Sequence, residues 1–152
     1  DLIAAVFAVG NEDDLVRLMA RVDALSAFLS SEDGSNLLTA YKRAANIVRI
    51  EEKKNGVPFS GEYVLEVLEV GDAQALAKGL ATVEASVTDA LKIEDFASAM
   101  MALATLREPL DVFFENVTVN ADDQGIRFAN LNLLARIGSV MDQIAVFSNI
   151  EG

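Results

Sequence analysis

Apolar residues recur at intervals of three or four through most of this chain, a spacing that places them on one face of an α-helix. The longest such pattern lies in 122–148 and contains Ile126, Leu133, Leu134, Ile137, Val140, Met141, Ile144 and Phe147. Asp122 stands at the position of an N-cap, where its carboxylate can accept hydrogen bonds from free backbone N–H groups. We therefore predict that the longest helix follows Asp122 and that the other segments pack against it.

The first half of the chain contains three shorter patterns of the same kind. An apolar run over 1–9 ends at Gly10, and the acidic residues at 11–14 are typical of the start of a second helix. A polar turn at 30–35 precedes a third helix, which we expect to begin near Asn36. The Asn-Gly-Val-Pro sequence after its basic end is a strong turn signal and is expected to terminate it.

The second half of the chain predicts further helices with their own start signals. Asp72 is expected to cap one helix, and Glu94 with Asp95 is expected to begin the next. Pro109 suits the first turn of a short helix, because a residue there needs no backbone donor. For 59–71 we expect either a short strand or an irregular apolar segment, and not a sheet.

Composition supports an all-α fold. The chain has 152 residues, 52% of them hydrophobic, and two prolines. This length suits one domain with a substantial core, and a chain rich in Ala and Leu favours closely packed helices. We predict a single all-α domain over residues 1–152, a bundle of about six or seven helices. Because the chain opens without an initiator Met, we expect it to be cut from a longer protein.

The residue inventory excludes several kinds of chemistry. Cys and His are absent, which excludes disulfides, thiolate or imidazole metal ligands, and Ser-His or Cys-His nucleophiles. There is no glycine-rich phosphate loop, and no apolar run is long enough for a membrane span. Paired acids at 13–14, 51–52, 94–95 and 122–123 are expected to cap helices or face solvent. We predict no catalytic residue, cofactor site or metal site in this chain.

The basic residues are the one useful electrostatic feature. A net charge of −12 disfavours nucleic acid on average, so a nucleic-acid role needs cations gathered on one face. Five of the twelve cations fall in one helix and at its end: Lys42, Arg43, Arg49, Lys53 and Lys54. Lys42, Asn46 and Arg49 share a helical face, where cations can hold phosphates and Asn can contact a base edge or a 2′-hydroxyl. The alternative, favoured by composition alone, is a solvated face whose cations stabilise the helix end.

Other polar and aromatic candidates can likewise contact RNA or have only a structural role. Arg127 and Arg136 on the last helix can bind phosphate or face solvent, and they lie about half a turn out of register. Asn120 is more typical of a turn than of a base contact. Phe113 and Phe114 are more typical of a core than of a stacking surface for bases.

Several ordered segments resemble the DALR-type anticodon-binding domain. Residues 37–49 (LLTAYKRAANIVR) resemble its YKR-x-x-NI segment, and 113–123 (FFENVTVNADD) resemble its FFD-x-V-x-V-x-A-x-D signature. Residues 131–137 resemble its leucine-rich helix, and 94–103 also fit. The resemblance spans nearly the whole chain and is closest to the domain at the C-terminal end of the β subunit of bacterial glycyl-tRNA synthetases.

This resemblance implies a helical module that binds the anticodon region of tRNA-Gly in a glycine–tRNA ligase. In that family the enzyme has α and β subunits; the α subunit activates glycine with ATP and Mg²⁺, and the β subunit grips the tRNA. The implied partners are tRNA-Gly, the α subunit and the other β-subunit domains, in the cytoplasm, with no membrane or DNA. Two alternatives are the same domain of an arginyl-tRNA synthetase and a helical subunit-interaction module without RNA contact.

The family's motif residues fall on Tyr41, Lys42, Arg43, Asn46, Phe113, Phe114, Asn120 and Asp122. Of these, we expect Phe113 and Phe114 in the core and Asn46 as a buried bridge between helices. Ala129 and Asn130 replace an Asn-Arg pair of the family, which removes one expected cation from the last helix. The candidate RNA-binding residues are therefore Lys42, Arg43, Asn46, Arg49, Lys53, Lys54, Asn120, Arg127 and Arg136.

Overall fold

The computed structural model describes residues 2–7, 15–145, 147 and 150. Within these ranges the chain forms seven α-helices, one short 3-10 helix and no strand. The elements are α1 (Leu2–Phe7), α2 (Leu15–Ser30), α3 (Glu32–Asn55), η1 (Leu65–Val67), α4 (Asp72–Lys92), α5 (Phe96–Ala104), α6 (Arg107–Asn116) and α7 (Gln124–Asp142). The predicted all-α bundle of six or seven helices is confirmed, and 59–71 is a loop with one 3-10 turn.

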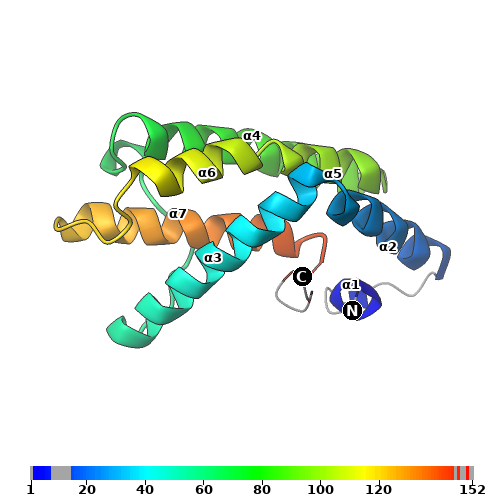
Figure 1. The fold of residues 1–152 in the computed structure, drawn as a ribbon, viewed down its shortest axis with the longest axis horizontal. Helices are drawn as coiled ribbons and strands as arrows, with labels where there is room; N and C mark the ends of the chain where they lie inside the picture. Colours follow the sequence, from blue (N-terminus) through cyan, green and yellow to red (C-terminus); the bar gives the residue numbers. More distant parts are fainter. Residues whose placement is uncertain (1, 8–14, 146, 148–149, 151–152) are drawn as a thin grey trace.

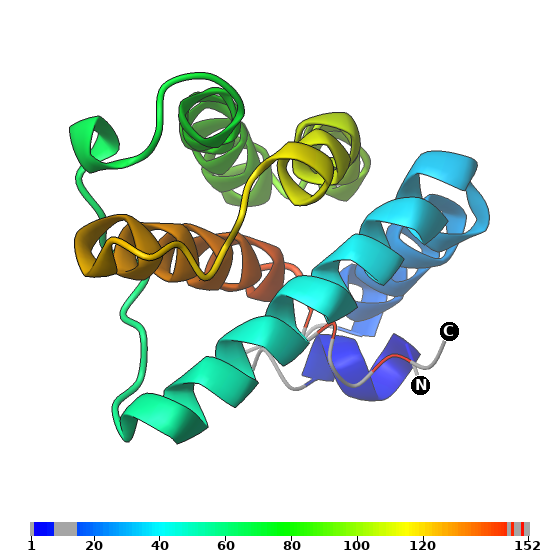
Figure 2. The same cartoon turned by 60° about the vertical axis from the view of Figure 1, so that its left-hand side comes forward.

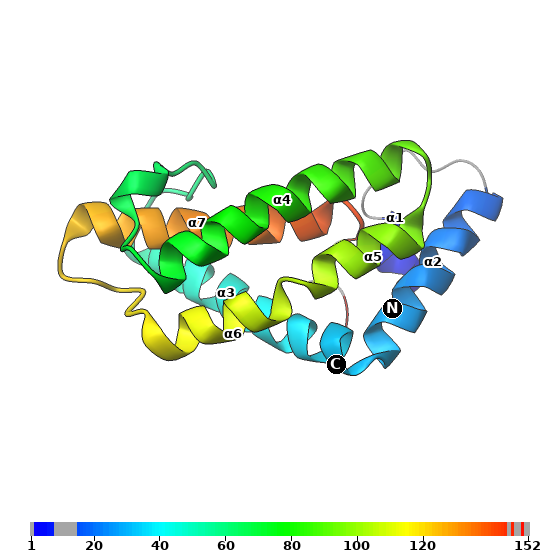
Figure 3. The same ribbon diagram turned by 90° about the horizontal axis from the view of Figure 1, so that it is seen from above.

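The helices pack around α3 and α4, so the expectation that the other segments pack against the last helix is wrong for most of them. α7 contacts α3 and α4, α6 contacts the same two helices, and α2 contacts α1, α3 and α5. Figure 1 shows α3 crossing α7 obliquely, with its C-terminal end projecting beyond the rest of the bundle, and the turned view of Figure 2 shows the same projection. Seen from above, α4 passes over α7 (Figure 3). The basic end of α3 therefore stands out from the bundle that α7 helps to fill.

α7 places one face in the core, as its apolar pattern predicts. Its buried residues include Leu131, Leu133, Leu134, Ile137, Val140 and Met141. The helix nevertheless ends at Asp142, because the backbone there tightens into i→i+3 hydrogen bonds, and Ile144 and Phe147 enter the core from beyond it. The longest helix is α3, with 24 residues against 19 in α7, so that prediction is wrong. In the described ranges, no helix combines the length and apolarity needed to cross a membrane.

The start of α3 lies earlier than the sequence suggests. The helix begins at Glu32 rather than Asn36, with Ser31 as its N-cap; the Ser31 hydroxyl accepts a hydrogen bond from the Gly34 N–H at 3.0 Å. Gly34 is not a turn residue. A Cβ at this position would lie 1.8 Å from the carbonyl oxygen of Phe28. Glycine therefore allows α2 and α3 to join through a single non-helical residue.

Two acidic residues expected as N-caps lie one position away from the cap. Asp123 rather than Asp122 caps α7, since the Asp123 carboxylate accepts a hydrogen bond from a backbone N–H in the first turn. Gly71 precedes α4, and Asp72 is the first helical residue, where its carboxylate accepts a hydrogen bond from Asn116. Both predictions are wrong by one residue: on α7 the neighbouring Asp123 forms the cap, and on α4 the N-cap position is Gly71, which has no side-chain cap.

The loop after α3 is held at both of its ends. Gly56, with φ of +73°, closes α3 in the left-handed conformation. The Phe59 N–H donates to the Glu52 carboxylate at 2.7 Å, and the Gly61 N–H donates to the Asn132 side chain on α7 at 3.0 Å. These bonds fix the loop against both α3 and α7.

Candidate nucleic-acid interface

A row of polar side chains runs along the outward face of α3. Lys42, Asn46, Arg49 and Lys53 are four, three and four residues apart, a spacing that places them on one side of a helix. Asn46, Arg49 and Lys53 are exposed, and Lys42 is half-buried. At 1.5 Å per residue, the row is about 16 Å long. We call these four residues the α3 row.

The two carboxylates in this part of α3 are engaged by the fold. Glu51 is only 5% exposed, and Glu52 accepts the hydrogen bond from the loop after the helix. Asn46 accepts a hydrogen bond from the Arg49 guanidinium at 2.7 Å, which orients Arg49 on the surface. The expectation that Asn46 is a buried bridge is wrong, because its side of the helix faces solvent. This face of α3 thus presents cations and an amide in a chain of net charge −12.

The ends of α3 account for part of this arrangement. Glu32 and Asp33 lie in the first turn, and Lys53 and Lys54 lie in the last, where cations favour the exposed carbonyl groups. That effect falls off within the final turn of a helix. Helix stabilisation therefore explains the two lysines but not Arg49, which lies more than one turn before the end.

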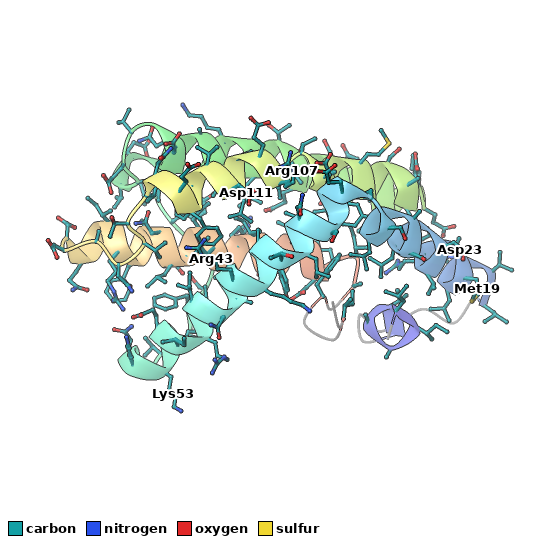
Figure 4. The ribbon with its side chains drawn as sticks, in the orientation of Figure 1. Met19, Asp23, Arg43, Lys53, Arg107 and Asp111 are labelled. Atoms are coloured by element: carbon teal, nitrogen blue, oxygen red, sulfur yellow. The ribbon has the colours of Figure 1, made fainter. Side chains whose placement is uncertain are left out.

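Arg43 lies beside the α3 row but points elsewhere. Its guanidinium is 4.3 Å from the centre of the Phe114 ring, which in turn meets the buried Phe113 ring edge-on at 5.8 Å. Figure 4 shows Arg43 pointing toward α6, while Lys53 points away from the bundle at the projecting end of α3. Arg43 thus joins α3 to α6 through a cation–π contact. Phe113 is in the core as predicted, and Phe114 is half-buried against it.

A buried ion pair ties the basic end of α3 to α7. The Glu51 carboxylate lies 2.5 Å from the Arg127 guanidinium, and the two side chains are 6% and 12% exposed. Asn120 donates to Glu51 and accepts from Arg127, each at 3.2 Å, and Lys54 approaches the same carboxylate at 3.3 Å. The hydrogen bond from Arg127 lowers the pKa of the Glu51 carboxyl, against the opposing effect of burial. Asn120 and Arg127 are therefore engaged within the fold.

Arg136 lies on the α4 side of α7. Its guanidinium holds the Glu84 carboxylate through two hydrogen bonds of 2.7 Å, the bidentate geometry typical of Arg–carboxylate pairs. This contact raises the pKa of Arg136 and lowers that of Glu84. With Tyr63, the pair lines an open groove of about 880 Å³ between α4 and the loop after α3. Arg136 is thus not part of the α3 row.

Two further motif positions support the fold. Tyr41 is 5% exposed, its ring lies 5.8 Å from that of Phe147, and its hydroxyl donates to the Asp142 carboxylate. Asn130 is fully buried and donates to two backbone carbonyls in the loop before α7. The position where the family pattern has a cation therefore faces inward in this chain.

Sequence reasoning missed the role of Glu51. The acids at 51–52 are expected to cap or face solvent, yet Glu51 is the centre of a buried pair, so that expectation is wrong for this residue. Glu51 follows Ala44 and Val48 at helical spacing on the inner face of α3, and this register is the signal that indicates burial. Its partner Arg127 lies 76 residues away and has no local signal.

Two kinds of comparison with known proteins agree with each other. Residues 37–149 match the DALR anticodon binding domain. The whole chain aligns with the glycine–tRNA ligase beta subunit of Rhodospirillum centenum at 53% identity, of Phenylobacterium zucineum at 49% and of Cereibacter sphaeroides at 45%. The chain spans 21 to 22% of the length of these relatives, about a fifth. Since the family match covers most of the chain, including the α3 row and α7, the chain belongs to the DALR anticodon binding domain family.

Proposed function

We propose that this domain binds the anticodon region of tRNA-Gly as part of the β subunit of a glycine–tRNA ligase. Membership of the DALR family supports binding to tRNA. The relatives described above are glycine–tRNA ligase beta subunits, which favours glycine over arginine as the amino acid of the whole enzyme. The wider activity and the cytoplasmic location are part of the same proposal.

The α3 row is the observation that carries this proposal. Its cations contact phosphates of the RNA backbone, and the Asn46 amide reaches a sugar hydroxyl or a base edge. The row runs from the middle of α3 to the helix end that projects from the bundle, where an RNA strand can approach it from solvent. Arg43 flanks the row and adds positive charge, whereas Lys54 contacts the Glu51 carboxylate.

The remaining candidates have a positioning role in this proposal. Asn120 and Arg127 hold Glu51 and thereby fix the basic end of α3 relative to α7. Arg136 fixes α7 relative to α4 through Glu84. The charges of Arg127 and Arg136 are compensated by carboxylates within the fold, so these two residues contribute little direct attraction to RNA.

The overall charge of the chain shapes how such binding behaves. With a net charge of −12, attraction to RNA is confined to the α3 row and its flanks, and salt screens it readily. Other domains of the β subunit and the α subunit supply further contacts, so this domain adds to the affinity of the whole enzyme through avidity.

Catalysis belongs to other parts of the proposed enzyme. Among the residues that the structure describes, no three Asp or Glu side chains gather into a site for a metal ion, and the chain has no His or Cys. In this proposal, glycine activation with ATP and Mg²⁺ takes place in the α subunit.

The proposal is tested with a variant that neutralises the three cations of the α3 row: Lys42→Gln, Arg49→Gln and Lys53→Gln. Binding of tRNA-Gly is measured by fluorescence anisotropy from low to moderate salt. Three lost phosphate contacts are expected to weaken binding at low salt by about tenfold or more and to reduce the slope of log K against log salt by about 2.

Lys78→Gln with Lys92→Gln is the matched control, because both lysines are exposed on α4. The control is expected to bind like the parent. Equal binding by the α3-row variant and the parent would remove the basis of the proposal. A module that only joins subunits would show no chemical-shift change with tRNA and a clear change with the partner subunit.

A further inference from the structure

Two phenylalanine side chains lie where α3, the loop after it and α7 meet. The rings of Phe59 in the loop and Phe128 on α7 have centres 5.8 Å apart and planes tilted by 49°. Phe128 is 37% exposed and Phe59 is half-buried. Figure 2 shows this loop leaving the projecting end of α3 and passing α7 on its way to η1. The ring pair is therefore at the surface close to the basic end of α3.

These two aromatic residues lie outside the hydrophobic core. The other phenylalanines whose side chains the structure describes are buried or packed against the core: Phe28, Phe96, Phe113, Phe114 and Phe147. Phe59 and Phe128 do neither, and the nearby loop residue Val57 is 54% exposed. A pair of rings that packs outside the core and keeps part of its surface open is suited to an external ligand.

The ring pair is held in place by hydrogen bonds from both sides. The Phe59 N–H donates to the Glu52 carboxylate at 2.7 Å. The Asn132 side chain accepts from the Gly61 N–H and donates to the Phe128 carbonyl oxygen, each at 3.0 Å. Since Asn132 joins the loop to the turn of α7 that carries Phe128, the two rings are set relative to each other before any ligand arrives.

Cations adjoin the ring pair. The Arg127 guanidinium lies 5.4 Å from the centre of the Phe128 ring and contacts Glu51, which also contacts Lys54. Lys54 follows Lys53, the last residue of the α3 row. The ring pair adjoins Glu51 and Glu52, on the side of α3 that faces α7 and the loop, so a strand held by the α3 row turns around the end of α3 to reach the rings.

We propose that Phe59 and Phe128 form a stacking platform for an unpaired base of the RNA strand that the α3 row holds. This proposal rests on the proposed function. Cationic grooves with exposed aromatic rings are the usual means of binding unpaired nucleotides, because each base has a π-face that stacks on a ring. The α3 row supplies the attraction to phosphate, and the ring pair selects a strand whose bases are turned out of a helix.

The test compares two substitutions at one ring. Phe128→Leu keeps an apolar side chain and removes the π-face, whereas Phe128→Tyr keeps the ring. The probe is the anticodon stem-loop of tRNA-Gly, intact and with each loop base in turn replaced by an abasic site. Phe128→Leu is expected to weaken binding of the intact stem-loop about tenfold, and Phe128→Tyr to bind like the parent.

The abasic stem-loops identify the stacked base. At one loop position the abasic site is expected to weaken binding to the parent about tenfold and to have no further effect on Phe128→Leu. Val57→Ala removes exposed apolar surface nearby and is expected to bind like the parent. Circular dichroism checks that all variants fold.

The outcomes separate this proposal from the proposed function. If binding depends on the α3 row but Phe128→Leu binds like the parent, the stacking proposal is overturned and tRNA binding stands. The stacking proposal is also overturned if Phe128→Leu weakens the intact and every abasic stem-loop equally, as expected if the ring only holds the loop against α7. If the parent does not bind the stem-loop, both proposals are overturned.

Discussion

The basic end of α3 and the body of α7 carry similar cations in opposite surroundings. On α3, the side chains of Arg49 and Lys53 are exposed at the surface. On α7, Arg127 and Arg136 each hold a carboxylate from another helix. The contrast teaches that the surroundings of a cation, rather than its presence in a motif, decide whether its charge is available to RNA.

The largest difference expected between the two helices is in folding stability. Leu133 on α7 is fully buried, so Leu133→Ala is expected to lower the free energy of unfolding by about 3 kcal/mol. Asn46 on α3 is exposed, and Asn46→Ala is expected to change the free energy of unfolding by less than about 0.5 kcal/mol. Urea denaturation measures both. A similar loss for the two variants would break the contrast, because it would place the α3 row in the packing.

The next effect concerns the ion pair that joins the two helices. Glu51→Gln leaves the Arg127 guanidinium in place without its charged partner, and is expected to lower the free energy of unfolding by about 2 kcal/mol. Replacing both partners, with Glu51→Leu and Arg127→Met, is expected to recover much of that loss, because no charge remains buried. If Glu51→Gln is as stable as the parent, Arg127 is not held structurally and joins the candidates for direct RNA contact.

The Glu51 carboxylate is also expected to make the folding stability depend on pH. The pKa of Glu51 is lowered from 4.5 in the folded state, so its contribution to stability is complete above about that pH and is lost as the pH falls through the folded-state value. The parent is therefore expected to lose stability below pH 4.5 more steeply than Glu51→Gln. Denaturation curves at a series of acidic pH values measure this, and parallel losses would contradict it.

The smallest effect is expected at the other arginine of α7. The side chain of Arg136 is 42% exposed and that of Glu84 is 23% exposed, so solvent screens their attraction. Arg136→Gln is expected to lower the free energy of unfolding by less than about 1 kcal/mol and to leave tRNA binding unchanged. A loss of RNA affinity in this variant, with stability retained, would extend the interface beyond α3.

Much of the fold could be predicted because helical periodicity is a local property. The inward register of α7 and the common face of Lys42, Asn46 and Arg49 follow from spacing alone. The start of α3 could not be found in this way. Gly34 looks like a turn residue in the sequence, and only its closeness to the Phe28 carbonyl shows that glycine is needed inside a helix.

Whether a candidate cation is paired with a carboxylate depends on contacts between distant parts of the chain. Glu51 and Arg127 are 76 residues apart, and Glu84 and Arg136 are 52 apart. No local pattern predicts such pairs. The same holds for Phe59 and Phe128, since the loop and α7 meet only in the folded chain. The sequence therefore identifies the candidate cations but does not show which of them are paired with carboxylates.

Tyr41 and Glu51, which both face inward from α3, limit where residues can be inserted into or deleted from this chain. Both residues are anchored to α7 or its continuation, so the number of residues between them is fixed. Adding or removing one residue would rotate the rest of α3 by about 100°, carrying Arg49 and Lys53 out of line with Lys42. Gly56 has open space around it, so the turn after α3 is where added residues leave the helix register intact.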